Sequence, residues 1–189
     1  MTTSAHPTPT RHTARSGFTA RWPAGAITVL IGAFVAVVGA LWVTDHVLGS
    51  EPVDATGWVI LAATLLRLAT IGVALASIQH WGRQLPAGPL LAALWGCAAA
   101  QLIYPVAETM VKALILLGAV ELPPVGIGNM TSTGWFNFAA AWLVFGVPGA
   151  LFVAAARSYQ NRTGARWCWA VAGTTGGGLA LLTIGLIIG

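Results

Sequence analysis

Five long apolar stretches, separated by short polar segments, constrain the fold of this chain more than any other feature. They cover residues 24–43, 58–78, 89–119, 135–156 and 167–189. The hydrocarbon core of a bilayer is about 30 Å thick, so about 20 consecutive apolar residues cross it as a helix. The sequence therefore predicts an all-α integral membrane bundle of five transmembrane helices, with residues 22–189 as its membrane domain.

Composition excludes a water-soluble domain and a nucleic-acid-binding protein. Hydrophobic residues make up 57% of the chain and charged residues 7%, whereas a soluble domain carries about 25% charged residues. The formal net charge of +4 resides mainly in short loops, and neither a basic helix nor an aromatic RNA-binding motif accompanies it. We therefore expect the lipid bilayer to be the main partner, and no nucleic acid.

Residues 1–21 differ sharply from the rest of the chain. They are rich in Ser, Thr, Pro and Ala, and they carry Arg11, Arg15 and Arg21 without any acid. Such a segment buries too little apolar surface to fold, which predicts a disordered cytoplasmic tail. The apolar run that follows is longer than a typical signal-peptide core, which favours an uncleaved membrane anchor; cleavage after Ala40 is the alternative.

The charges fix the expected orientation. Under the five-span scheme, seven of the nine basic residues fall on one side: Arg11, Arg15, Arg21, Arg83, Arg157, Arg162 and Arg166. The acids Asp45, Glu51, Asp54, Glu108 and Glu121 fall on or near the other side. Because Lys and Arg accumulate in cytoplasmic loops, the N-terminus is expected inside and the C-terminus outside. Tryptophans near both ends of the spans fit the aromatic belts of a membrane protein.

The third stretch combines surplus length with a polar stripe. A helix over this whole stretch is too long to cross the bilayer upright, so it must bend at Pro105, protrude, or turn along the outer interface. The polar residues of the stripe are spaced four, three, four and four apart, which places them on one helix face. They are Cys97, Gln101, Tyr104, Glu108 and Lys112. Polar residues so aligned should face protein or water and not lipid.

Arg67 lies near the middle of the second stretch, where an arginine costs a few kcal/mol and needs a partner or water. The depth of the residues indicates Gln101 and Tyr104 as its neighbours. Glu108 lies roughly 13 Å away in depth, too far for direct contact, but a shift of the third stretch by one turn, with outward extension of the Arg67 side chain, would bring Glu108 within reach as a counter-ion. The candidate polar pocket, opening outward, comprises Arg67, Gln101, Tyr104, Glu108, Lys112 and Asn137. Asp45 and His46 would line its mouth, and the loop 121–134 either covers the opening or only connects two spans.

A structural role for the same residues stays open. Glu108 and Lys112 are four residues apart and can satisfy each other, leaving Arg67 to donate to carbonyls and to Tyr104. The whole stripe would then hold helices together. Likewise, Gly173 and Gly177 form a GxxxG pattern that fits either packing within the chain or contact with a second copy. Pro148 should kink the fourth helix.

Sequence motifs for catalysis and for cofactors are missing. The chain has no GxSxG, HExxH, Walker A or GxGxxG sequence, and its loop acids lack supporting His or Cys residues for a metal. No cofactor and no metal are therefore expected. Cys97 and Cys168 lie in apolar stretches far apart and are interpreted as small core residues.

The segment from Trp58 to Tyr104 resembles small multi-pass membrane proteins of actinobacteria. The resemblance depends on the mid-helix basic residue Arg67, on the run 81–86 (Trp-Gly-Arg-Gln-Leu-Pro), on Trp95-Gly96 and Tyr104, and more weakly on the Trp135 region. It covers about half of the chain. It implies a bacterial host and supplies no mechanism, because that group has no established activity. Position 67 would be expected to be lysine, and arginine there keeps the charge but changes its geometry.

Three functions follow from these features. The first is a membrane protein that binds a small molecule or lipid in the outward-opening polar pocket, with or without enzymatic activity. The second is a structural or assembly subunit that packs against partners through its glycine-rich helices. The third is a transporter or channel, which would require oligomerisation of so small a chain. The lack of a catalytic constellation favours a non-enzymatic role.

Overall fold

The computed structural model describes residues 12–188, and this part of the chain consists of helices and their connections. Five helical segments are long and apolar enough to cross a membrane: Arg21–Leu48, Ala55–Ala76, Ala87–Leu116, Ser132–Thr163 and Trp167–Ile184. The five predicted spans are therefore confirmed as helices, although most of their ends differ by a few residues.

The order of elements includes two π-helical turns that the sequence pattern did not predict. The first span is α1 (His12–Val43) continued by the π-helical turn η1 (Thr44–Leu48), and the second is α2 (Ala55–Ala76). The short 3-10 helix η2 (Trp81–Gln84) leads into α3 (Ala87–Leu116), and η3 (Gly126–Gly128) lies in the following loop. The fourth span consists of α4 (Ser132–Ala141), the π-helical turn η4 (Trp142–Gly146) and α5 (Val147–Thr163), and the fifth is α6 (Trp167–Ile188).

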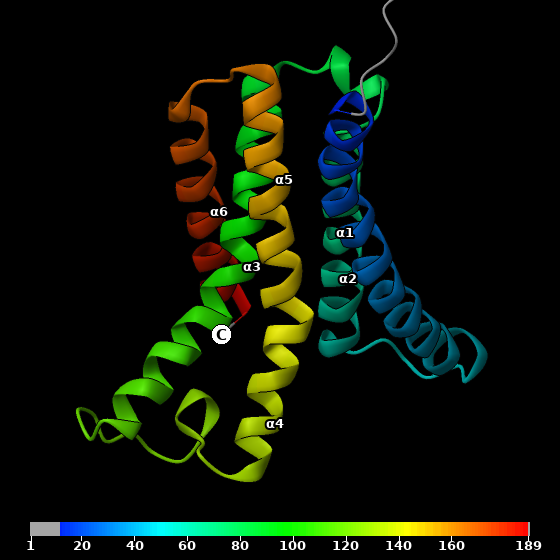
Figure 1. Ribbon diagram of the computed structural model, residues 1–189. Helices are drawn as coiled ribbons and strands as arrows, with labels where there is room; N and C mark the ends of the chain where they lie inside the picture. The colour runs from blue at the N-terminus through cyan, green and yellow to red at the C-terminus, as the bar shows by residue number, and fades with distance from the viewer. Residues whose placement is uncertain (1–11, 189) are drawn as a thin grey trace, which may run out of the picture.

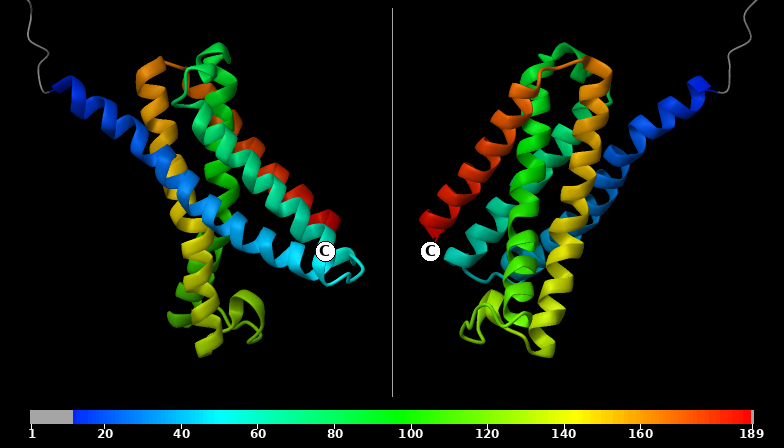
Figure 2. Two further views of the ribbon diagram at one scale, coloured as in Figure 1. Left: turned by 90° about the vertical axis from the view of Figure 1, so that its right-hand side faces the viewer. Right: turned by 60° about the vertical axis from the view of Figure 1, so that its left-hand side comes forward.

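The helices form two groups that meet along part of their length. Figure 1 shows α3, α5 and α6 side by side, with the hairpin of α1 and α2 beside them. Contact between the groups runs mainly through α1 and α5, which cross at a steep angle in the left-hand view of Figure 2. We call the end that carries the α2–α3 and α5–α6 connections the basic end, and the opposite end the acidic end.

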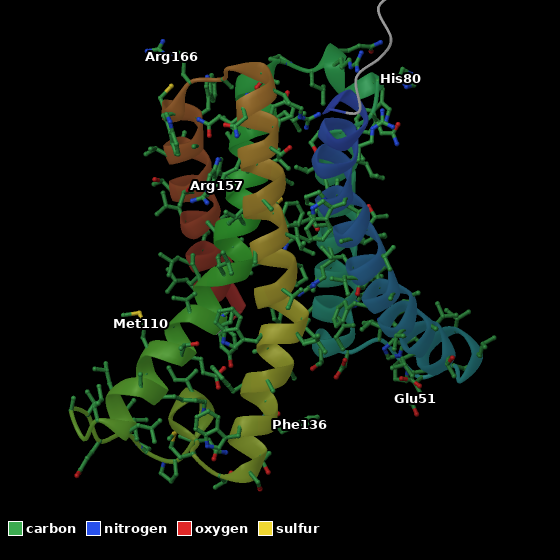
Figure 3. The ribbon with its side chains drawn as sticks, in the orientation of Figure 1. Glu51, His80, Met110, Phe136, Arg157 and Arg166 are labelled. Atoms are coloured by element: carbon green, nitrogen blue, oxygen red, sulfur yellow. The ribbon has the colours of Figure 1, made fainter. Side chains whose placement is uncertain are left out.

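Charge separates between these two ends. Arg83 and Arg166 lie in the connections at the basic end, whereas Glu51 and Glu121 lie in those at the acidic end. Figure 3 shows Arg166 and His80 at one end and Glu51 toward the other. The chain thus has the charge separation on which the predicted orientation depends.

The apolar core fills the half of the bundle toward the basic end, which we call the basic half. Ile27 and Ile31 of α1, Leu91 and Leu94 of α3 and Phe152 of α5 are fully buried there. Toward the acidic end, in the acidic half, the α1–α2 hairpin and the α3–α4 connection spread apart in Figures 1 and 2.

Close contact between α3 and α6 depends on glycine. A Cβ atom added at Gly173 would collide with the Ala92 carbonyl, and one at Gly177 with the Gly96 carbonyl. Small residues allow two backbones to approach this closely. Of the two interpretations of the GxxxG pattern, these two glycines serve packing within the chain.

The two cysteines differ in their surroundings. Cys97 packs against the core of the bundle, as predicted. Cys168 is exposed, so its prediction as a core residue was wrong. It precedes Gly177 by about two and a half helical turns, so it lies on the side of α6 opposite the contact with α3.

Several helix boundaries depart from the predicted ones. Helix α1 already begins at His12, inside the segment predicted as a disordered tail; residues 1–11 of that segment lie outside the described residues. The fourth span extends to Thr163, where Gly164 adopts a left-handed conformation with φ of 66° and ends the helix. At the start of α2, the Asp54 carboxylate accepts a hydrogen bond from the Gly57 N–H at 2.7 Å.

The third span stays helical through its proline. Helix α3 includes Pro105, and Figure 1 shows its second half slanting away from the first. The span is thus one continuous helix that changes direction, as in the first of the three predicted possibilities.

Candidate binding site in the membrane-spanning bundle

The polar stripe of α3 faces the interior of the protein along most of its length. Gln101, Glu108 and Lys112 are buried, and Cys97 is partly buried. Tyr104 is 46% exposed and lies at the edge of the stripe. The periodicity of the sequence therefore identified a buried polar face, as required of polar side chains in a membrane helix.

Lys112 and Glu108 form a buried pair near the acidic end. The Lys112 Nζ atom lies 3.6 Å from Glu108 Oε1 and donates a hydrogen bond to the Asn129 carbonyl at 2.6 Å. It also lies 5.2 Å from the centre of the Trp135 ring and 5.9 Å from that of Phe138. One ammonium group thus connects α3 with the loop before α4 and with α4 itself.

This pair stabilises the acidic half by linking α3 to the loop before α4 and to α4 itself. Both side chains are 3% exposed or less, so solvent does not stabilise either charge. Removing one member of such a pair leaves the other uncompensated and costs about 3–5 kcal/mol. The geometry corresponds to the structural alternative for Glu108 and Lys112.

Arg67 turns toward the bundle from the middle of α2. Its neighbours Leu66 and Leu68 are 57% and 45% exposed, as expected for side chains that meet lipid. Arg67 itself is only partly exposed. An arginine in the middle of a membrane span must face protein, water or a polar ligand, because the hydrocarbon chains of lipids offer it no acceptor.

The Arg67 guanidinium group contacts two aromatic rings and donates from one nitrogen to a backbone carbonyl. Its Cζ atom lies 4.6 Å from the centre of the Phe34 ring on α1 and 4.4 Å from that of Phe145 in η4. Its Nη1 atom donates to the Val144 carbonyl at 3.0 Å. Aromatic rings attract a planar cation over their faces and leave its edges available for hydrogen bonds.

The Val144 carbonyl accepts from Arg67 because the fourth span cannot satisfy it in the usual way. In an α-helix, the N–H of residue 148 would donate to this carbonyl. Pro148 has no N–H, so the carbonyl lacks its helical donor. Arg67 replaces that donor from a neighbouring helix. The predicted disturbance at Pro148 therefore takes the form of a π-helical turn, Trp142–Gly146, just before it.

The π-helical turn is also fixed to α3. The Trp142 Nε1 atom donates to Thr109 Oγ1 at 3.0 Å, and Thr109 Oγ1 donates in turn to the Pro105 carbonyl at 2.6 Å. The Trp142 ring folds over Gly146, where an added Cβ atom would collide with it. The surface presented to Arg67 is thus held by contacts with the bent part of α3.

Three buried polar atoms in this region have no hydrogen-bond partner. They are Arg67 Nη2, Gln101 Oε1 and Glu108 Oε2. A buried donor or acceptor without a partner costs about 1–3 kcal/mol, so each calls for water or a ligand. Arg67 Nη2 supplies donors, whereas the other two atoms are oxygens.

The structure brings some of the predicted site residues together. The Tyr104 ring lies 6.5 Å from the Phe145 ring, which also stacks on Arg67, so Tyr104 is an indirect neighbour of Arg67. Gln101 lies beside Gly149 of α5. Among the described residues, the ion pair within 4.0 Å joins Glu108 to Lys112 and not to Arg67.

Other predicted residues lie away from Arg67. Asn137 is exposed on α4. His46 packs edge-on against the Trp42 ring at 5.0 Å and lies beside Gly57, so it serves the α1–α2 hairpin. Because that hairpin end diverges from the α3–α4 connection in Figures 1 and 2, Asp45 and His46 do not line a mouth above the stripe.

No protein-family model matches this chain, and no match was found among curated proteins or solved structures. The geometry of the site therefore carries the functional argument.

Sequence reasoning missed the groups that hold Arg67. Phe34 and Phe145 are single aromatic residues in apolar stretches, where nothing distinguishes them from residues that meet lipid. Pro148 did carry a usable signal, since a proline inside a membrane helix marks a free carbonyl four residues earlier. The Asn129 carbonyl that accepts from Lys112 is a backbone group and has no sequence signature.

Proposed function

We propose that this chain is a multi-pass protein of a bacterial plasma membrane, with its N-terminus inside, that binds a small molecule or lipid at Arg67. The ligand presents a hydrogen-bond acceptor, such as a carboxylate, phosphate or carbonyl oxygen, to the guanidinium group. The observation that carries this proposal is the buried Nη2 atom of Arg67, which lacks a partner in the middle of a membrane-spanning helix.

The contacts around Arg67 support a binding role because they hold the cation and leave donors free. Phe34 and Phe145 hold the guanidinium group through cation–π contacts, and the Val144 carbonyl occupies Nη1. Nη2 is thus presented with little remaining freedom, which lowers the entropy lost on binding. An anionic or carbonyl oxygen at this nitrogen would satisfy a donor whose burial is otherwise unfavourable.

The orientation is supported by the separation of charge between the two ends of the bundle. Arg83 and Arg166 occupy the connections that would face the cytoplasm, in keeping with the preference of basic loops for that side. Lys112 and Glu108 support ligand binding indirectly, because they hold α3, the loop before α4, and α4 together.

The assembly-subunit alternative depended on the glycine-rich fifth helix. Gly173 and Gly177 are engaged with α3 of the same chain, so they no longer favour a partner. The third alternative, an oligomeric transporter or channel, stays a prediction that ion flux in liposomes would test.

Native mass spectrometry of the protein released gently from its own membrane tests the binding proposal. We expect a defined extra mass on the unaltered protein and its loss in Arg67→Leu. Arg166→Leu is the matched control, because it removes the same charge from an exposed connection. A bound mass that survives Arg67→Leu at the level of the control would refute binding at Arg67.

A further inference from the structure

A second group of arginines, unrelated to Arg67, converges on the basic end of the bundle. A pocket of about 380 Å³ lies between the end of α2, η2 and the end of α5, and Arg83 and Arg162 line it. A second hollow of about 240 Å³ adjoins it through shared lining residues and adds Arg21 and His80. Three helical elements, α1, η2 and α5, thus each bring one arginine to a continuous depression.

The walls of this depression contain no carboxylate to balance the arginines. Neither lining includes an Asp or Glu residue. Arg162 is held in place by the Ser77 carbonyl, to which its Nη2 atom donates at 3.1 Å, and by the Ser158 carbonyl at 3.2 Å. Its guanidinium carbon lies 5.8 Å from the centre of the Tyr159 ring. Three arginines that line one depression without a carboxylate in its linings favour an anion among them.

An apolar groove continues this depression along the outside of the bundle. A hollow of about 400 Å³ runs between α2 and α3, lined by apolar residues including Ala69, Gly72, Val73 and Leu90. It shares Ala76 and Leu85 with the basic pocket. From Ala76 to Ala69 it follows about 10 Å of α2, from the basic end toward the middle of the membrane.

A polar, positively charged pocket joined to an apolar groove matches an amphiphile and not a free ion. The positive-inside rule accounts for arginines in loops on one side. It does not account for their convergence on one hollow or for the continuation of that hollow between two membrane helices.

We propose that the basic end binds an anionic phospholipid, with the phosphate of the headgroup among Arg21, Arg83 and Arg162 and an acyl chain in the α2–α3 groove. Arginine donates to phosphate oxygens in a fork geometry that suits this role, and basic pockets between membrane helices bind anionic headgroups. A zwitterionic lipid would bring a cationic group next to the arginines and is disfavoured. This site is separate from Arg67 and does not depend on the function proposed there.

The experiment is retention of added lipid by the delipidated protein, measured by native mass spectrometry. Phosphatidylglycerol and phosphatidylcholine with the same acyl chains are supplied as equal mixtures. We expect phosphatidylglycerol to be retained at least about tenfold better, and Arg21→Gln combined with Arg83→Gln to abolish this preference. Arg166→Gln, also in a connection at the basic end but outside both linings, is the charge-matched control. Arg67→Leu should change nothing here, which separates this test from the previous one.

The groove is tested by a variant that fills it without touching the charges. A Cβ atom at Gly72 would meet nothing within 4 Å, so Gly72→Leu should fold and should lower retention of phosphatidylglycerol several-fold. Gly32→Leu, on α1 and equally free of contacts, is its control.

Inorganic phosphate added as a competitor distinguishes a free-anion site from a lipid site. Displacement of the lipid by millimolar phosphate, together with no effect of Gly72→Leu, would overturn the proposal. So would equal retention of both lipids, or equal loss in Arg166→Gln.

Discussion

The two halves of the bundle are held together by different kinds of contact. The basic half is filled by Ile27, Leu91, Leu94 and Phe152, and it needs no buried charge inside its core. The acidic half spreads apart and depends on specific polar contacts, above all Lys112 with Glu108 and with the Asn129 carbonyl. Arg67 lies where the apolar core gives way to this polar half. The comparison indicates that apolar packing stabilises the basic half, whereas the acidic half depends on specific polar contacts.

The largest expected effect is the loss of one member of the buried pair in the acidic half. Glu108→Gln should destabilise the protein by about 3–5 kcal/mol, because it leaves the Lys112 ammonium buried without its counter-charge. Equilibrium unfolding in mixed micelles measures it. Replacing both residues together, as Glu108→Leu with Lys112→Met, should recover most of that loss. If Glu108→Gln alone is as stable as the unaltered protein, the pair does not stabilise the acidic half.

The stability of the basic half should depend on the shape of the side chains between α3 and α6 and not on charge. Gly173→Val should cost about 1–3 kcal/mol, since its side chain collides with the backbone of α3 and forces the two helices apart. Gly176→Val is the matched control, because a Cβ atom there meets nothing within 4 Å. The same unfolding assay compares them. If both valines cost the same, α6 does not pack on α3 through this face.

The link between Arg67 and the proline of the fourth span predicts a smaller effect that is measured as a coupling. Pro148→Ala restores an N–H that competes with Arg67 for the Val144 carbonyl. We therefore expect Arg67→Leu to cost about 1 kcal/mol less in the Pro148→Ala background than in the unaltered protein. A double-mutant cycle of unfolding free energies gives this value. Strict additivity of the two changes would mean that Arg67 does not replace the missing helical donor.

The smallest expected effect concerns the hydrogen bond between the π-helical turn and α3. Thr109→Val keeps the shape of the side chain but removes the acceptor for Trp142 Nε1. Interhelical hydrogen bonds in membranes contribute about 0.6 kcal/mol on average, so a loss of about that size is expected. Thr183→Val, whose hydroxyl only donates within its own helix, should lose less. If Thr183→Val loses more stability than Thr109→Val, the loss comes from the low helix propensity of valine and not from the missing hydrogen bond.

The features that the sequence predicted are those encoded locally. Apolar length identified five helices, and the spacing of Gln101, Glu108 and Lys112 identified the buried face of α3 because both follow from helix geometry. The pairing of Glu108 with Lys112 was also local, and it was one of the two alternatives left open.

The features that the sequence did not predict depend on contacts between distant segments. Arg67 meets Val144, Phe34 and Phe145 across three helices, and no periodicity within α2 indicates them. Pro148 predicted a disturbance of the fourth span, but the sequence did not indicate that it takes the form of a π-helical turn at Trp142–Gly146. The sequence did not predict the basic pocket for another reason. The preference of basic residues for the cytoplasmic side already accounted for its arginines, so nothing in the sequence indicated that they converge in space.

Cryo-electron microscopy of the protein in nanodiscs formed from its own membrane would show which groups contact Arg67, and it is therefore the decisive test of ligand binding there. We expect non-protein density within hydrogen-bonding distance of Nη2, with the Phe34 and Phe145 rings against the guanidinium group and the Val144 carbonyl at Nη1. An Nη2 atom bonded instead to a protein group, such as the Glu108 carboxylate or the Gln101 amide, with no such density, would contradict it and would make Arg67 a structural link between helices.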